Sequence, residues 1–127
     1  MESNVYLLGY REDVSELLNN SDFFVFPTYF EGLPGALIEA IISRTPSIVS
    51  AIEENKECFN GANALFFETR NIDDLKAKME QALNLENWNQ MTQDALLNAQ
   101  SNFDISKVSL DYEEFYKSIL LHSKGKN

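Results

Sequence analysis

Short apolar runs alternate with segments of helical spacing along the first half of the chain, and this alternation limits the choice of folds more than any other feature. Each apolar run has the length of a strand that is buried on both faces. Strands that alternate with helices indicate a parallel sheet with helices packed on it, so we expect a Rossmann-like α/β fold of about four strands. The expected strands are residues 5–8, 23–26, 47–49 and 64–67, and the expected helices between them are residues 13–18 and 34–43, with one or two helical turns in 51–61.

The second half of the chain is expected to be mostly helical, because its apolar residues recur every three or four positions. Asn71 is expected to cap the first of these helices at its N-terminus, with Asp74 at the third helical position, and Asp104 is expected to cap the last one. The expected helices cover residues 72–83, 88–103 and 105–120, and residues 122–127 form a tail that is expected to fray.

The charge balance limits the partners. Twenty acidic residues against ten Lys and Arg give 127 residues a formal charge of −10, which disfavours nucleic acid and anionic membranes as ligands. An anionic ligand therefore requires a local site made of backbone N–H groups and a few well-placed cations.

Composition also bears on the compartment and on metal binding. The longest apolar runs are too short to cross a bilayer, and the first ten residues lack the regions of a signal peptide, so a cytoplasmic location is expected. Cys58 is the only cysteine, which excludes an internal disulfide and a cysteine-based metal site. We expect Cys58 to be a small core residue.

The segment 27–35 connects an expected strand to an expected helix with two glycines and a proline. Ligands of doubly wound sheets bind beyond the carboxyl ends of the strands, where such loops lie. Gly32 and Gly35 would let a phosphate or a sugar approach the main chain closely, and the start of the helix favours negative charge. Loops of this kind are common, so the loop alone does not establish a site.

Glu39 lies on the expected helix 34–43, on the face opposite its apolar residues. That opposite face otherwise carries small side chains, where a solvated helix would normally show several long polar ones. Two interpretations remain open from the spacing. Either a second element packs closely on this face and Glu39 caps its edge, or the carboxylate accepts hydrogen bonds from ligand hydroxyls. The apolar face is formed by Pro34, Leu37, Ile38, Ile41 and Ile42.

Residues 31–39, EGLPGALIE, resemble the Glu-x7-Glu motif of retaining B-type glycosyltransferases, especially the large family four. The surrounding segments are similar to the family in the same order: 5–10 (VYLLGY), 21–27 (SDFFVFP), 45–49 (TPSIV) and 60–66 (NGANALF). The resemblance extends over about residues 4–120. It implies the donor-binding half of such an enzyme, which transfers a sugar from a nucleotide-diphosphate sugar with retained anomeric configuration, without a resident cofactor and often without a metal.

The resemblance also implies roles for individual residues. Glu31, as the catalytic residue, would meet hydroxyls of the transferred sugar, and Glu39 would accept hydrogen bonds from the ribose hydroxyls of the nucleotide. Both roles suit ionised carboxylates, which only accept hydrogen bonds. The other implied donor contacts are the backbone N–H groups of Gly32, Leu33 and Gly35, which would face the sugar and distal phosphate, and Tyr10 and Arg11, which would lie near the base.

The sequence departs from the family pattern in two ways. The Arg and Lys that grip the diphosphate normally precede the strand at residue 5, so residues 1–121 are expected to be a donor-binding domain that is incomplete at its start. The acceptor-binding domain would then be a missing partner, the isolated chain would be inactive, and an exposed sheet edge would favour self-association. The family's Gly-Gly pair is replaced after residue 50, which weakens the expectation of phosphate contacts there.

Two other functions remain as alternatives. The chain could be a non-catalytic interaction or remnant module that keeps the Rossmann-like fold, with its two glutamates serving only packing and capping. A signalling receiver has a similar alternation, but it needs clustered aspartates at the strand ends, and Asp22 precedes its strand. The nucleotide, the sugar and the acceptor are not specified by these residues.

Overall fold

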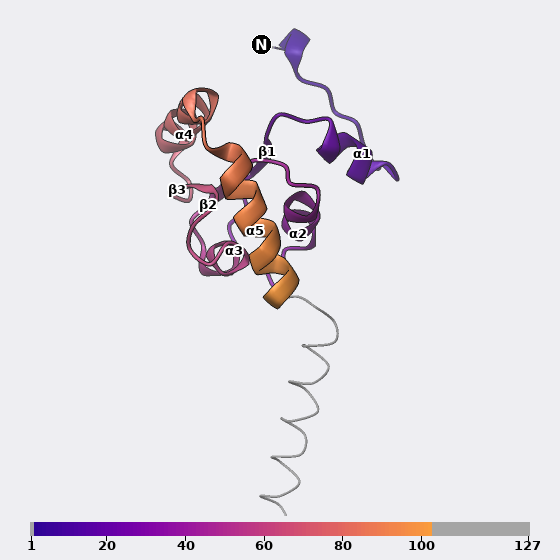
Figure 1. Cartoon of the computed structure of the whole chain (residues 1–127). Coiled ribbons are helices and arrows are strands. Elements are labelled where there is room, and N and C mark those ends of the chain that lie inside the picture. Colours follow the sequence, from indigo (N-terminus) through magenta and orange to yellow (C-terminus); the bar gives the residue numbers. More distant parts are fainter. Residues whose placement is uncertain (1, 103–127) are drawn as a thin grey trace, which may run out of the picture.

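The structure is a computed structural model that describes residues 2–102, and a small parallel sheet lies at its centre (Figure 1). The three strands are adjacent in sequence order, β1-β2-β3, and both pairs are parallel. Val25 pairs with Ile48, and Val49 pairs with Phe66. The sheet confirms the expected α/β fold, with the strands at β1 (Phe24–Phe26), β2 (Ser47–Ser50) and β3 (Leu65–Phe67).

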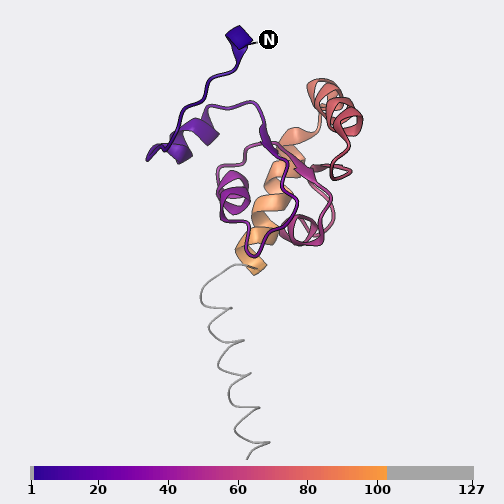
Figure 2. The ribbon, with the colours of Figure 1, turned by 180° about the vertical axis from the view of Figure 1, so that it is seen from behind.

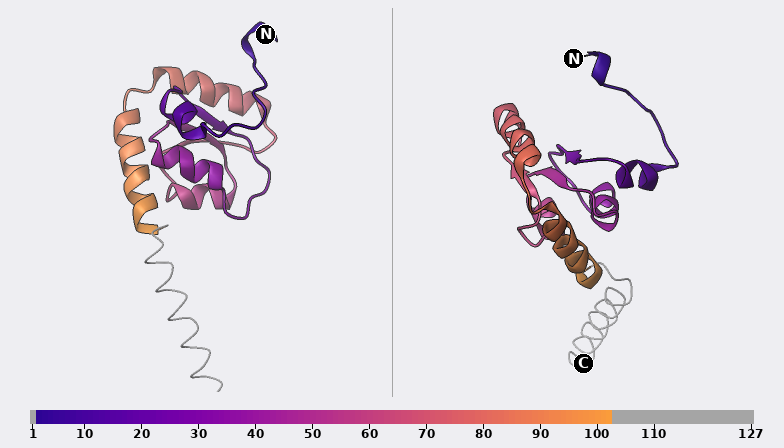
Figure 3. Two further views of the ribbon diagram at one scale, coloured as in Figure 1. Left: turned by 90° about the vertical axis from the view of Figure 1, so that its right-hand side faces the viewer. Right: turned by 45° about the horizontal axis from the view of Figure 1, so that its top comes forward.

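The prediction of a fourth strand at residues 5–8 is wrong. A short 3-10 helix, η1 (Glu2–Asn4), precedes these residues, which form an arm that runs away from the body of the molecule in every view (Figure 2 and both views of Figure 3). Their side chains are exposed, up to 97% at Leu7. An apolar run becomes a strand only where a neighbouring strand supplies backbone hydrogen bonds, and among residues 2–102 none pairs with this arm.

Helices pack on both faces of the sheet. Strand residues point alternately to the two sides, and apolar side chains on each side are covered by helices. One core cluster contains Val49 with residues of α2 (Gly35–Ile42), α3 (Glu53–Cys58) and α5 (Trp88–Asn102). The other contains Ile48, which packs with residues of α4 (Ile72–Asn84) and with Trp88. The two apolar neighbours of β2, Ile48 and Val49, thus belong to different cores, which explains why apolar residues stand side by side in this strand.

The helices follow the sequence pattern closely. The expected helix at residues 13–18 is α1 (Val14–Asn19), and the expected helices at 72–83 and 88–103 are α4 and α5. Asn71 caps α4 as predicted, since its side chain accepts a hydrogen bond of 2.9 Å from the Asp74 amide. No helix in the described part of the chain is long and apolar enough to span a membrane. The expected helix 105–120, its cap Asp104 and the tail 122–127 lie outside the described residues.

Cys58 is a buried core residue, as predicted, and is only 2% exposed. Its thiol donates to the Glu54 carbonyl oxygen at 3.4 Å. Burial, with a smaller contribution from the neighbouring Glu57 carboxylate, raises the pKa of the Cys58 thiol to about 11. The side chain is therefore a neutral thiol at physiological pH, and it serves packing.

Candidate functional site

The glycine-bearing loop, residues 27–34, leaves the carboxyl end of β1 and enters α2. Its end is fixed by Pro34, which is buried and whose carbonyl oxygen accepts hydrogen bonds from the amides of Leu37 (3.0 Å) and Ile38 (3.1 Å). Leu37 and Ile41 then anchor α2 in the core. The loop is therefore held at its helical end, at the edge of the sheet where ligands of parallel α/β folds bind.

Gly32 and Gly35 present uncovered main chain. A Cβ atom at either position would meet no atom within 4 Å, and neither residue has a positive φ, so the protein itself requires glycine at neither place. Among the described residues, the amides of Gly32, Leu33 and Ala36 have no hydrogen-bond partner. The amide of Gly35 differs from the expectation, because it donates to the Leu33 carbonyl oxygen at 2.9 Å and is not free for a ligand.

The two carboxylates of the motif have no protein partner in the described part of the chain. Glu31 is half-buried in the loop, and Glu39 is exposed on α2. Within residues 2–102, neither side chain forms a hydrogen bond or an ion pair. Gly35 and Ala36 beside Glu39 are exposed as well, whereas Ala40, which helical spacing places on the same face, is 0% exposed. Glu39 thus lies at the border between an open and a covered part of this face of α2.

The predicted apolar face of α2 needs one correction. Leu37 and Ile41 are buried and Ile38 is half-buried, but Ile42 is 62% exposed. Ile42 is the last residue of the helix, where the chain turns away towards β2, so helical spacing alone placed it wrongly.

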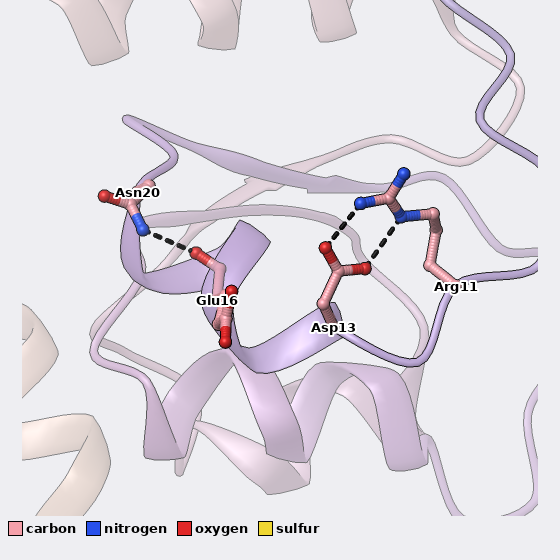
Figure 4. Close-up of polar contacts among 4 residues, drawn as sticks. All are labelled: Arg11, Asp13, Glu16 and Asn20. Atoms are coloured by element: carbon pink, nitrogen blue, oxygen red, sulfur yellow. Dashed lines mark hydrogen bonds and ion pairs between the residues drawn. The ribbon is translucent and has the colours of Figure 1, made fainter.

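Tyr10 and Arg11 lie where the arm meets α1, and the structure does not bring their side chains into contact with the glutamates. Tyr10 is 91% exposed. The Arg11 guanidinium forms a bidentate ion pair with Asp13, in which Nε donates to Oδ1 at 2.7 Å (Figure 4). Hydrogen bonding to Arg11 lowers the pKa of the Asp13 carboxyl, and Asp13 raises the pKa of Arg11. Both groups are exposed, and the Arg11 charge already has a partner.

A buried polar network that the sequence analysis missed fixes the beginning of the loop. The Ser50 hydroxyl, at the end of β2, donates to the Thr28 carbonyl oxygen at 2.6 Å. Asn55 of α3 donates through Nδ2 to the Ser50 carbonyl oxygen (3.0 Å) and to the Ser50 hydroxyl (3.1 Å). These hydrogen bonds join the end of β2, helix α3 and the beginning of the loop that carries Glu31.

A pocket of about 90 Å³ opens between the loop after β1 and the loop after β3. Three residues with hydroxyl groups, Thr28, Ser50 and Thr69, belong to its lining, together with Tyr29 and Arg70. The Arg70 guanidinium carbon lies 5.0 Å from the centre of the Tyr29 ring. No sequence motif predicted this pocket. One signal for it is that these three hydroxyl residues each follow a predicted strand, at positions that meet at one edge of a parallel sheet.

Comparison with known proteins agrees with the fold. Residues 1–85 match the family Glycosyl transferases group 1. The chain is 32% identical over 122 residues to the N,N'-diacetylbacillosaminyl-diphospho-undecaprenol alpha-1,3-N-acetylgalactosaminyltransferase of Campylobacter jejuni, which covers 91% of this chain and 31% of that enzyme. It is 37% identical over 75 residues to the UDP-Gal:alpha-D-GlcNAc-diphosphoundecaprenol alpha-1,3-galactosyltransferase of Escherichia coli, covering 58% of this chain and 19% of that enzyme.

A third relative, a glycogen synthase of Acholeplasma laidlawii, is 31% identical over 127 residues, covering 89% of this chain and 26% of that protein. The chain belongs to the glycosyl transferases group 1 family, and the class of protein is a glycosyltransferase. It spans about a fifth to a third of the length of these relatives.

Proposed function

We propose that this chain binds a nucleotide-diphosphate sugar and that the complete enzyme transfers the sugar with retention of its anomeric configuration. The observation that carries the proposal is the position of Glu39, which is exposed and has no protein partner among residues 2–102, on the helix that follows a strand-to-helix loop with free amides. A carboxylate and free N–H groups at the carboxyl edge of a parallel sheet suit a ligand that offers both hydroxyl groups and phosphate oxygens.

Each carboxylate has a separate role in this proposal. Glu39 accepts hydrogen bonds from the ribose hydroxyls, and Glu31, on the loop, meets hydroxyls of the transferred sugar as the catalytic residue. The free amides of Gly32 and Leu33 face the sugar and the distal phosphate. Tyr10 lies near the base, whereas Arg11 would have to exchange its ion pair with Asp13 for any contact with the nucleotide.

The nucleotide donor has support from a relative's printed name, because the Escherichia coli enzyme is named for a UDP-linked galactose. Catalysis additionally requires an acceptor site. Since the chain spans only part of its relatives, we propose that the isolated chain binds donor without transferring the sugar, and that an acceptor domain is its partner in the complete enzyme.

Donor binding tests the proposal directly. In a ligand-observed NMR titration with uridine, guanosine and adenosine diphosphates, we expect saturation transfer from the protein to one of these nucleotides. Glu39→Ala should raise its Kd at least tenfold, because each lost hydrogen bond to a charged group contributes about 1.5–3 kcal/mol. The free energy of unfolding should change by less than about 0.5 kcal/mol, since the side chain is exposed and unpartnered.

Glu80→Ala is the matched control, because Glu80 is an exposed helical glutamate on α4 whose ion pair with Lys76 spans 3.9 Å. We expect it to bind nucleotide like the unmodified chain. If Glu39→Ala binds the nucleotide as tightly as the unmodified chain, the role assigned to Glu39 is wrong. If saturation is transferred to none of the nucleotides at millimolar concentration, the result favours a non-catalytic module.

The free edge of β1 leads us to propose self-association of the isolated chain. β1 pairs only with β2 among the described residues, and the apolar arm at residues 5–8 is exposed in the same molecule. Light scattering should therefore give a mass that rises with concentration. Leu7→Lys should abolish the rise, whereas Leu97→Lys, on α5, should not; a monomer mass at every concentration would contradict the proposal.

A further inference from the structure

The pocket between the loops after β1 and β3 has the chemistry of an anion site. Beside apolar residues, its lining includes hydroxyl and amide side chains and Arg70, and no acidic residue of the described part of the chain lines it. This composition is unusual for a chain with twenty acidic residues and a charge of −10. At about 90 Å³ the pocket has room for a phosphoryl group and is too small for a nucleoside.

Arg70 is oriented without being neutralised. It lies over the ring of Tyr29, and within residues 2–102 it forms no ion pair, whereas Arg11, Lys56 and Lys76 each have a carboxylate partner. A guanidinium that stacks on an aromatic ring through its face keeps the N–H groups at its edge available for planar, bidentate contact with a phosphate.

The neighbouring carboxylates are directed elsewhere. Glu68 accepts a hydrogen bond from the side chain of Asn71 at 2.7 Å, and Asp74 accepts one from the Glu68 amide at 2.6 Å. Asp73, in the first turn of α4, is exposed and does not line the pocket. Glu68 and Asp74 thus form hydrogen bonds within the segment that carries Arg70, and among residues 2–102 none of the three carboxylates forms an ion pair with its guanidinium.

We propose that this pocket binds a phosphoryl group, with Arg70 as the cation, Thr28 and Thr69 as hydroxyl donors, and Tyr29 as the residue that positions Arg70. Thr28 belongs to the same loop as Glu31, so the pocket adjoins the candidate donor site along the chain. The identity of the carrier, a nucleotide diphosphate, rests on the proposed function; the binding of free phosphate or pyrophosphate does not.

Titration of the isotope-labelled chain with inorganic pyrophosphate, followed by amide chemical shifts, tests the inference. We expect saturable shifts at residues 69–71 and at Thr28. Arg70→Asn should raise the Kd about tenfold or more, because a charge-assisted contact is lost. Arg44→Asn is the matched control. Both arginines have a positive φ, 68° at Arg70 and 55° at Arg44, which asparagine tolerates. Arg44 precedes β2, at the amino ends of the strands, whereas Arg70 follows β3, at their carboxyl ends.

Tyr29→Leu separates positioning from charge. It keeps an apolar side chain but removes the ring, so the Kd for pyrophosphate should rise less than in Arg70→Asn, by about two- to fivefold for a contact of about 0.5–1 kcal/mol. Absence of saturable shifts, or equal losses in Arg70→Asn and Arg44→Asn, would overturn the phosphoryl site. Glu39→Ala distinguishes the two proposals, because it should weaken nucleotide binding and leave pyrophosphate binding unchanged.

Discussion

Leu37→Ala is expected to lower the free energy of unfolding by about 2–5 kcal/mol, which is the usual cost of truncating a fully buried leucine. Leu37 is 0% exposed and lies in the core cluster with Ile41, Val49 and Phe59. Since domains of this size are stable by only about 5–15 kcal/mol, the variant would lose much of its stability. Urea unfolding followed by circular dichroism measures the change.

Leu33→Ala is the matched control, because the same atoms are removed from a side chain that is 71% exposed. Its unfolding free energy should change by less than about 0.5 kcal/mol. Similar losses in the two variants would show that α2 does not pack on the sheet as described. Leu37 and Glu39 lie on roughly opposite sides of one helix, so the packing of the first holds the second towards solvent.

The elements that the sequence predicted correctly depend on local patterns. The three strands β1, β2 and β3 follow from short apolar runs, and the cap at Asn71 follows from a side chain that bonds three residues ahead. The arm at residues 5–8 has the same apolar character, yet it forms no strand. Strand formation requires a neighbour distant in sequence, and no local pattern specifies whether that neighbour is present.

The candidate site was predictable to the same extent. Helical periodicity correctly places Glu39 away from the core, but it does not predict that Ala40, on the same face, is fully buried. The ion pair of Arg11 joins it to Asp13, only two positions later, so the sequence contains a local signal that the Arg11 charge has a partner. The contact between Tyr29 and Arg70 could not be predicted from the sequence, because it joins loops that follow two different strands. It also depends on a left-handed backbone at Arg70, which the residue type does not indicate.

Asn55→Asp is expected to destabilise the chain by about 3–5 kcal/mol, the cost of an uncompensated buried charge. Asn55 is 0% exposed, and its Nδ2 donates to both oxygens of Ser50. An aspartate has nearly the same shape but replaces this donor by an acceptor that faces the Ser50 carbonyl oxygen. The other side-chain oxygen, Oδ1, already lacks a hydrogen-bond partner among the described residues, so no existing donor compensates the charge.

Asn89→Asp makes the same chemical change at an exposed position in the first turn of α5, where negative charge is favourable, so it should be neutral or slightly stabilising in urea unfolding. A small loss in Asn55→Asp, similar to this control, would contradict the buried network.

The effect of Asn55→Asp should also reach the candidate site. Ser50 donates to the Thr28 carbonyl oxygen, so a disturbed Ser50 releases the beginning of the loop. Amide shifts in Asn55→Asp should therefore extend from Thr28 to Glu31, because the position of Glu31 on the loop depends on a hydrogen bond made behind it.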